Sequence, residues 1–208
     1  MRKLTLAIPC VVFLVLLGCS EAPQTAAVKK DPEKAAEPIA GQSALYRMYG
    51  AARSWASDAQ VLKLTSSLIS EVPDVPRGKA AVWEATFTSA NRGQSRSYTY
   101  SIVEVPPTLH KGVFAGLEGG WTGPRGNTTP FLIAAVKIDT DVAYQTALKN
   151  GGEDYDKKNP GKPITIMLEK NNKFPDPVWR IIWGESLGTS NFSVFIDAST
   201  GDFKEKMH

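Results

Sequence analysis

Large apolar residues recur every three or four positions in the first part of the chain, at Leu45, Met48, Tyr49, Ala52 and Trp55. This spacing places them on one face of a helix. Ser43 stands where an N-terminal cap is expected, since its hydroxyl could accept a backbone N–H. The pattern therefore predicts an amphipathic helix that begins near residue 43.

The segment that follows changes to the two-residue spacing of β-strands. Residues 60–70 are strand-like, and prolines and a glycine interrupt the chain between 73 and 78. Apolar and polar side chains alternate over 81–89 and again over 97–102. The sequence Asn91-Arg92-Gly93 between them is typical of a turn. We expect a hairpin with one buried face and one solvated face.

The second half of the chain shows a similar order. Residues 131–138 are apolar and predict a strand, and Asp139 or Thr140 could cap a helix that ends at Gly151-Gly152. Further strands are predicted over 164–168, 178–183 and 192–196, with a proline break at 175–177 and a turn at 184–190.

Both halves thus show helix, strand, proline break, strand, turn and strand. The tryptophans of AAVWEA and DPVWRI, Trp83 and Trp179, lie 96 residues apart. We predict an α+β fold of tandem αβββ units, residues 43–105 and 131–208, each a helix packed on an antiparallel sheet. The Gly- and Pro-rich residues 106–130 are interpreted as their connection. A coincidental similarity within one α+β domain is the alternative.

Residues 1–19 have the pattern of an export signal. The chain begins with Met1-Arg2-Lys3 and continues with a mostly apolar run, residues 4–17, that contains a proline. A membrane-spanning helix needs about 20 apolar residues, so this shorter run predicts a cleaved signal. Its end, Leu16-Leu17-Gly18-Cys19, resembles a bacterial lipobox. The resemblance implies removal of residues 1–18 and acylation of Cys19; an ordinary signal peptide with an incidental cysteine is the alternative.

A lipid on Cys19 would anchor the mature chain to a membrane, because two or more acyl chains bind a bilayer stably. Ser20 follows the cysteine, and in the sorting pattern of Gram-negative lipoproteins a serine there implies delivery to the outer membrane, facing the periplasm. Residues 19–42 are rich in Ala, Pro, Lys and Glu and poor in large apolar residues. We expect them to form a flexible tether.

Composition argues against several partners and cofactors. Removal of residues 1–18 lowers the formal net charge from +3 to +1, and there is no basic block, so nucleic acid is not an expected partner. The sequence has only two cysteines; Cys10 leaves with the signal and Cys19 is the lipid site. We therefore expect no disulfide, no metal site and no other cofactor in the folded part.

Part of the second half resembles a known family. The stretches FLIAAVKIDTDVAYQTALKNGG, PVWRIIWG and FSVFIDASTGDF, within Phe131 to Phe203, look like the PepSY-like group of secreted bacterial domains. The most specific part is the ending DASTG, residues 197–201, which the first half lacks. The resemblance implies a binding or regulatory module, sometimes one that acts on peptidases, without catalytic residues. Independently, Asp197 and Gly201 have the chemistry of a tight turn.

The sequence Gly184-Glu185-Ser186-Leu187-Gly188 matches G-x-S-x-G, the nucleophile elbow of serine hydrolases. That elbow needs a helix after the serine and a histidine later in the chain. Ser186 is followed by a predicted strand instead, and the only later histidine is the last residue, His208. We interpret the motif as a hairpin loop and predict that the protein is not an enzyme.

Other polar and aromatic groups also have structural interpretations. No cysteine or second histidine stands near His110 to complete a metal site, so we expect a surface residue. The acidic residues 153–156 lack the spacing of a calcium loop and predict a solvated turn. We assign Trp179 and Trp183 to the core rather than to a ligand platform.

Residues 112–126, GVFAGLEGGWTGPRG, are rich in glycine but match no phosphate-binding motif. Phe114, Trp121 and Arg125 are of residue types that anchor protein interfaces. We predict a mobile aromatic loop that contacts a partner; a loop that folds its tryptophan onto the sheet is the alternative.

These observations favour a non-enzymatic, membrane-anchored lipoprotein of the cell envelope that binds a protein or peptide or regulates a peptidase. Two other functions stay open. One is a structural component of envelope assembly or maintenance, which needs only its anchor and its fold. The other is an enzyme of unrecognised type.

Overall fold

The computed structural model describes residues 36–124 and 126–208. Its centre is an eight-stranded antiparallel sheet with the order β10-β9-β8-β7-β2-β4-β5-β6. The strands are β2 (Gln60–Ser67), β4 (Val82–Ser89), β5 (Gln94–Ser101), β6 (Gly112–Gly120), β7 (Ile164–Glu169), β8 (Val178–Trp183), β9 (Ser193–Asp197) and β10 (Phe203–Met207). A separate short pair joins β1 (Ile39–Ala40) to β3 (Lys79–Ala80).

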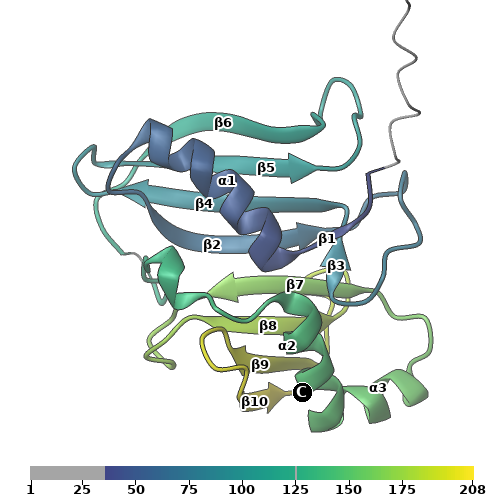
Figure 1. Cartoon of the computed structure of the whole chain (residues 1–208). Helices are drawn as coiled ribbons and strands as arrows, with labels where there is room; N and C mark the ends of the chain where they lie inside the picture. Colours follow the sequence, from purple (N-terminus) through teal and green to yellow (C-terminus); the bar gives the residue numbers. More distant parts are fainter. Residues whose placement is uncertain (1–35, 125) are drawn as a thin grey trace, which may run out of the picture. The chain divides into compact units, whose positions relative to one another are not determined.

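Two helices cover the same face of the sheet (Figure 1). Helix α1 (Gly41–Trp55) crosses β2, β4 and β5, and α2 (Thr140–Ala147) lies over β8 and β9. The predicted face of α1 is buried, and one continuous core contains side chains of both helices and the sheet. The predicted α+β class is therefore confirmed.

The start of α1 differs from the prediction. The helix begins at Gly41, and its capping position is Ala40, which has no capping side chain. The other helix supplies the acceptors instead: Gly41 N–H donates to Thr140 Oγ1 (2.7 Å) and Gln42 N–H to Asp139 Oδ1 (2.8 Å). Ser43 is therefore not the cap, because a carboxylate from a distant segment already satisfies this end of the helix.

Each half of the chain contributes four strands to this sheet, with a helix packed on them. The prediction gave each unit a sheet of its own with three strands. The structure instead has one eight-stranded sheet and one continuous core, so two separate units are not evident, and β6 and β10 were missed. β6 lies inside residues 106–130, which were interpreted as a connection, and its four glycines hid the alternation of its other side chains. β10 consists mostly of charged residues and has no buried face. Its sequence therefore lacks the alternation of apolar and polar residues by which a strand is recognised.

Trp83 and Trp179 make equivalent contacts in the two halves. Trp83 Nε1 donates to the carbonyl of Ile39 (3.1 Å), two residues before α1 begins. Trp179 Nε1 donates to the carbonyl of Ile138 (2.7 Å), two residues before α2 begins. Both indoles are fully buried. Each tryptophan therefore fixes the entry of its own helix onto the sheet.

The segment before α2 is not the predicted strand. Phe131 forms a single bridge with Val61, and a 3-10 turn, η1 (Ile133–Ala135), follows. Asp139 caps α2 as predicted, and its side chain accepts the N–H of Thr140. This segment runs back across the sheet to reach α2 and forms no ladder of its own.

The glycines at 151–152 bend the helical segment and do not end it. After α2, a wide turn, η2 (Leu148–Gly152), leads into α3 (Glu153–Lys158), and Gly151 has a φ of 114° at the bend. The acidic residues 153–156 therefore belong to a short helix rather than a turn. Asp156 accepts hydrogen bonds from Trp183 Nε1 (2.8 Å) and Tyr144 Oη (3.3 Å), which tie α3 to the core.

The DASTG segment forms the predicted turn, which joins β9 to β10. Asp197 Oδ1 accepts the N–H groups of Ser199 (2.8 Å) and Thr200 (3.1 Å), and Gly201 has a φ of 82°. Lys204 Nζ lies 2.9 Å from the other carboxylate oxygen. These bonds assign the segment a structural role.

The two halves of the sheet meet at β2 and β7. Their pairing covers three positions, Lys63–Thr65 against Met167–Glu169. At the next position Ser66 Oγ accepts the N–H of Ile166 (2.8 Å). Beyond it, β2 and β7 remain paired with β4 and β8, but not with each other.

The predicted signal and the lipid site at Cys19 lie outside the described residues. Within residues 36–124 and 126–208, no helix is both long enough and apolar enough to span a membrane.

Candidate binding edge

The predicted partner-contacting loop is in large part a strand. Residues 112–120 form β6, which pairs with β5 at one border of the sheet. Phe114 lies on β6 and Trp121 follows its last residue, whereas Arg125 lies outside the described residues. The structure therefore corrects the mobile loop to an edge strand and places two of the three candidate residues along it.

The side chains of β6 are unusually apolar for an edge strand. Val113, Phe114 and Leu117 are 39%, 47% and 94% exposed. Glu118 is the only charged residue among the nine of this strand. Edge strands usually carry charges or proline that prevent pairing with other chains. β6 carries no proline and, apart from Glu118, no charge, although it has one bulge opposite residues 96–98. Among the described residues no other strand pairs with its outer border, which is called its free border here.

The backbone of β6 presents groups to solvent at alternate residues. Trp121 N–H donates to Gly93 O (2.9 Å), which fixes this end of the β5–β6 ladder. Because successive residues of a strand point to opposite sides, the N–H and C=O groups of Glu118 and Gly120 point away from β5.

The other end of β6 follows the same rule. Ile102 N–H donates to Ala81 O (3.1 Å), so the backbone groups of Ile102 face β4. Alternation along β5 turns the backbone groups of Thr99 the other way, toward its β6 partner Phe114. The backbone groups of Phe114 thus face β5. The backbone groups of Val113 and Ala115 therefore point outward. The free border offers the donors and acceptors that a further strand requires.

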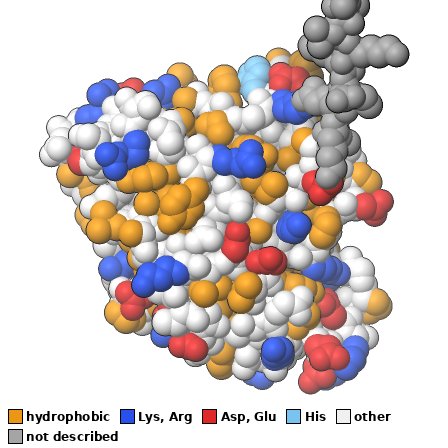
Figure 2. All heavy atoms as spheres, in the orientation of Figure 1, with side chains coloured by type: hydrophobic (Ala, Val, Ile, Leu, Met, Phe, Trp, Pro, Cys, Tyr) orange, Lys and Arg blue, Asp and Glu red, His pale blue; other side chains and the backbone are white. Residues whose placement is uncertain are grey.

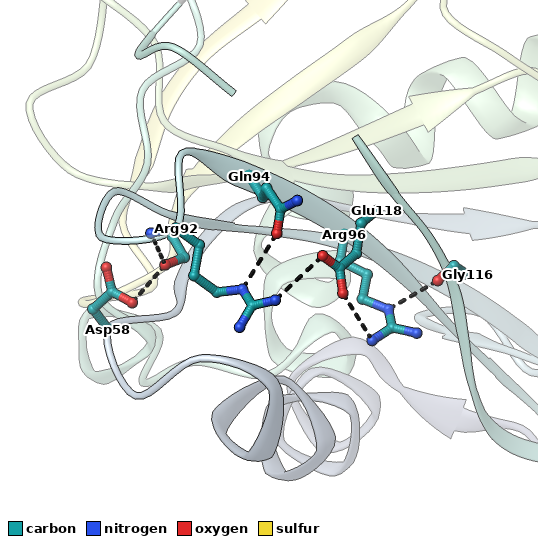
Figure 3. A network of polar contacts seen from close by, with 7 residues as sticks. Asp58, Arg92, Gln94, Arg96, Gly116 and Glu118 are labelled. Carbon is teal, nitrogen blue, oxygen red and sulfur yellow. Dashed lines mark hydrogen bonds and ion pairs between the residues drawn. The ribbon is translucent and has the colours of Figure 1, made fainter. Parts of the chain in front are cut away.

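Two arginines brace β6 at its bulge (Figure 3). Arg96 Nε donates to Gly116 O (2.8 Å), and Arg96 Nη1 lies 3.6 Å from Glu118. Arg92 Nη2 lies 3.4 Å from Glu118, and Arg92 Nε donates to Gln94 (3.3 Å). The only carboxylate of β6 is thus neutralised by side chains from the β4–β5 turn and β5.

The turn that carries Arg92 is itself pinned. Asp58 accepts hydrogen bonds from Ser89 Oγ (2.6 Å) and from Asn91 N–H (2.9 Å). These bonds, the one from Ser89 foremost, hold the pKa of the Asp58 carboxyl below its ordinary value. The turn that supplies Arg92 to the edge strand is therefore itself held by hydrogen bonds.

The loop before β6 packs against its first residues. The rings of His110 and Phe114 lie 4.4 Å apart, and His110 Nδ1 lies 3.0 Å from Glu104 Oε1. The N–H of Lys111 and then His110 lower the pKa of the Glu104 carboxyl. His110 is an exposed loop residue, as predicted. No group of three residues that could hold a metal occurs in the described parts of the chain.

Trp121 is fixed to the sheet through its backbone, and its contact with a partner stays a prediction. Its backbone closes the β5–β6 ladder at Gly93, and its residue is half-buried. It therefore extends the apolar border of β6 while remaining fixed to the sheet. The sequence analysis missed Leu117 and the bracing arginines, because neither is recognisable until β6 is known to be a strand.

The opposite border of the sheet is protected. β10 carries Lys204, Glu205 and Lys206. Lys173 forms an ion pair with Glu205, and a bulge lies between Phe203 and Glu205. Charges and a bulge are the usual means of blocking edge pairing. The two borders therefore differ in their capacity to accept another strand.

The G-x-S-x-G motif lies in the loop that joins β8 to β9. Ser186 Oγ lies 3.2 Å from Thr189 Oγ1, and Ser186 N–H donates to the same oxygen (3.0 Å). A strand follows the loop, whereas a nucleophile elbow leads into a helix. The geometry agrees with the hairpin-loop interpretation.

Charges of both signs are interspersed on the helix-bearing side of the molecule. Figure 2 shows lysine and arginine side chains next to aspartate and glutamate, with hydrophobic side chains between them. No continuous basic area is visible on that face among the described residues.

Comparison with known proteins adds one structural similarity. No protein-family model matches this sequence, and no curated protein matches it. The chain is similar in structure to a "putative lipoprotein" (CD1622) from Clostridium difficile 630, with a TM-score of 0.44 and 10% identity. The alignment covers 76% of this chain and 88% of that chain. At this identity the similarity concerns the path of the backbone alone.

Proposed function

We propose that this protein is a non-enzymatic, lipid-anchored component of the bacterial envelope that binds an extended segment of a protein or peptide along β6. The observation that carries the proposal is the free border of β6. This border is apolar, ordered by its arginine brace and supplied with outward backbone groups. A peptide that adds a strand to such an edge gains main-chain hydrogen bonds and side-chain contacts together.

The apolar side chains of this edge set the chemistry of the partner. Phe114 and Leu117 would contact alternate side chains of the added strand, and Trp121 would contact its end. We therefore expect an extended segment with apolar residues at alternate positions. Arg125 remains a sequence-based candidate for a further contact.

The membrane anchor is proposed from the sequence. Acylation of Cys19 would hold the folded unit beside the membrane through the residues that precede β1, because residues 39–42 of the predicted tether belong to β1 and α1. Ser20 favours the outer membrane, facing the periplasm. A PepSY-like origin of the second half, and a duplication that produced both halves, belong to the same proposal. The equivalent hydrogen bonds of Trp83 and Trp179 support the duplication.

The test is co-purification from envelope extracts, with the wild-type chain and Ala115→Pro. A proline at 115 removes an outward N–H, which the β5–β6 ladder does not use, so the fold is expected to persist. The expected result is a discrete protein or peptide that is recovered with the wild type and lost with Ala115→Pro. Lys206→Pro on β10 is the matched control and should retain it.

Recovery of the same partner with Ala115→Pro would show that the partner does not bind by pairing with β6. If nothing co-purifies with the wild-type chain but deletion of the protein weakens the envelope, the structural role is favoured instead. Hydrogen exchange of β5 amides in both proline variants verifies that the sheet is intact.

A further inference from the structure

A second feature, distant in sequence from β6, is a pocket of about 340 Å³ beside β3. Three segments line it: residues 66–69 at the end of β2, residues 72–73 and 75–81, and residues 161–164 before β7. It lies where β2 and β7 no longer pair with each other. A cavity of this size accommodates a small ligand or one end of a longer one.

The walls of the pocket combine apolar and polar surface in similar proportion. They include Val72, Val75, Pro76, Pro163 and Ile164. Val72, Val75 and Ile164 are only partly buried, and all three pack against the main core. They would lose contact with water if an alkyl chain lay against them.

The charged residues that line the pocket are all basic: Arg77, Lys79 and Lys162. Arg77 Nη1 donates to Lys162 O (3.1 Å), and Lys162 Nζ donates to Tyr155 Oη (3.1 Å). In the described parts of the chain, none of the three cations forms an ion pair with a carboxylate. Asp74 stands in the lining loop but is exposed and does not line the pocket.

The loop that holds these cations is fixed to the fold. Thr140 Oγ1 donates to Gly78 O (2.6 Å), and Lys79 N–H donates to Pro76 O (3.0 Å). Gly78 has a φ of 84°, and a Cβ there would come within 2.8 Å of Asp141 Cα. The pocket is thus largely pre-formed, which lowers the entropic cost of binding.

We propose that this pocket binds an aliphatic carboxylate of the medium-chain fatty-acid type. Its carboxylate would lie against Arg77, Lys79 and Lys162, and its alkyl chain along Val72, Val75 and Ile164. Three cations without carboxylate partners among the described residues, next to an apolar wall, complement such a molecule in both charge and polarity. The site is independent of β6 and of the partner proposed there.

The test is calorimetric titration of decanoate below its micelle concentration. The protein is the acyl-free mature chain, residues 20–208, which contains the compact unit Ala35–His208 with all of its core. Decanol and decyltrimethylammonium are matched probes without the negative charge. We expect saturable binding of decanoate, weaker binding of hexanoate and little binding of the uncharged and cationic probes.

Variants separate the pocket from general surface charge. Arg77→Ala combined with Lys162→Ala should weaken decanoate binding about tenfold or more, since hydrogen bonds to charged groups are lost. Lys158→Ala removes an exposed lysine that does not line the pocket and should leave the affinity unchanged. Equal binding of decanol, equal loss in Lys158→Ala, or no saturable binding of decanoate would each overturn the proposal.

Discussion

Asp139 Oδ1 accepts the backbone N–H of Gln42 at 2.8 Å, across 97 residues of sequence. The same oxygen accepts the N–H of Thr140 at 2.7 Å, at the start of its own helix. One carboxylate thus caps both helices, and the partial positive charge of each helix N-terminus favours it there.

This double role predicts a large effect of Asp139→Ala on stability. Loss of a single cap costs about 0.5–2 kcal/mol, so loss of a shared cap should lower the free energy of unfolding by about 2–3 kcal/mol. Urea unfolding of the wild type and of Asp139→Ala measures this difference in the free energy of unfolding. Ser43→Ala, at the position where the sequence predicts the cap, removes only the exposed hydrogen bond from Ser43 Oγ to Asp139 Oδ2 (3.1 Å). It should lower the free energy of unfolding by about 0.5 kcal/mol, clearly less than Asp139→Ala. Equal effects of the two substitutions would contradict the shared cap.

Gly41 and Gly50 form a matched pair within α1. A Cβ at Gly41 would come within 2.8 Å of Thr140 Cγ2 and within 2.9 Å of the Trp83 ring, whereas a Cβ at Gly50 would meet no atom within 4 Å. Gly41→Ala should therefore destabilise the protein by about 1–3 kcal/mol. Gly50→Ala should stabilise it by up to about 1 kcal/mol, because alanine favours the helix. Thermal or urea unfolding of both variants checks the opposite signs.

The buried hydroxyl of Tyr98 makes no hydrogen bond of good geometry within the described parts of the protein. Burial raises its pKa, and the nearby Arg96 guanidinium only partly offsets this effect. Tyr98→Phe removes this unsatisfied group and keeps the ring packed against Phe87, so stability should rise by about 1 kcal/mol. Tyr144→Phe is the control, since the Tyr144 hydroxyl donates to Asp156 and its loss should be destabilising. A loss of stability in Tyr98→Phe would indicate a bound water at this hydroxyl.

Asp197 makes stability depend on pH. Burial raises its pKa, but Lys204 and the N–H groups of Ser199 and Thr200 outweigh this effect, so the folded-state pKa lies below the ordinary value. The carboxylate therefore stabilises the fold above the ordinary aspartate pKa of about 3.9, and this contribution is lost as pH falls through the lowered value.

The corresponding substitution is Asp197→Asn. It should destabilise the protein at pH 7 by about 1–2 kcal/mol, and the difference from wild type should shrink as the pH falls through the lowered pKa of Asp197. Urea unfolding at a series of pH values measures this difference. Asp74→Asn, on an exposed residue of the loop between β2 and β3, should show no comparable trend. A difference that stays constant with pH would assign the effect to packing rather than charge.

The sequence predicted the elements whose pattern is local. The alternating hairpin strands and the face of α1 follow from apolar spacing alone, and Trp83 and Trp179 each lie on a predicted strand. β6 escaped prediction because glycine carries no side chain to show alternation. The cap of α1 escaped because Asp139 reaches it only through the tertiary fold.

The candidate site was only partly visible for the same reason. Phe114 and Trp121 were selected by residue type, and the structure places Phe114 on β6 and Trp121 directly after its last residue. The proposed pairing with a further strand also needs the outward N–H and C=O groups of Ala115 and Glu118, and the type of a residue does not reveal the direction of its backbone groups. The brace from Arg92 and Arg96 likewise depends on the register of β5 against β6.

The central claim is that β6 receives an added strand, and site-specific photo-crosslinking in native membranes tests it most directly. A photoreactive amino acid replaces Leu117 in the full chain, and a second variant carries it at Tyr46, which is also exposed but lies on α1. We predict a discrete adduct from position 117 that Ala115→Pro abolishes, and none of that size from position 46. No adduct at 117, or one that persists with Ala115→Pro, would contradict the account.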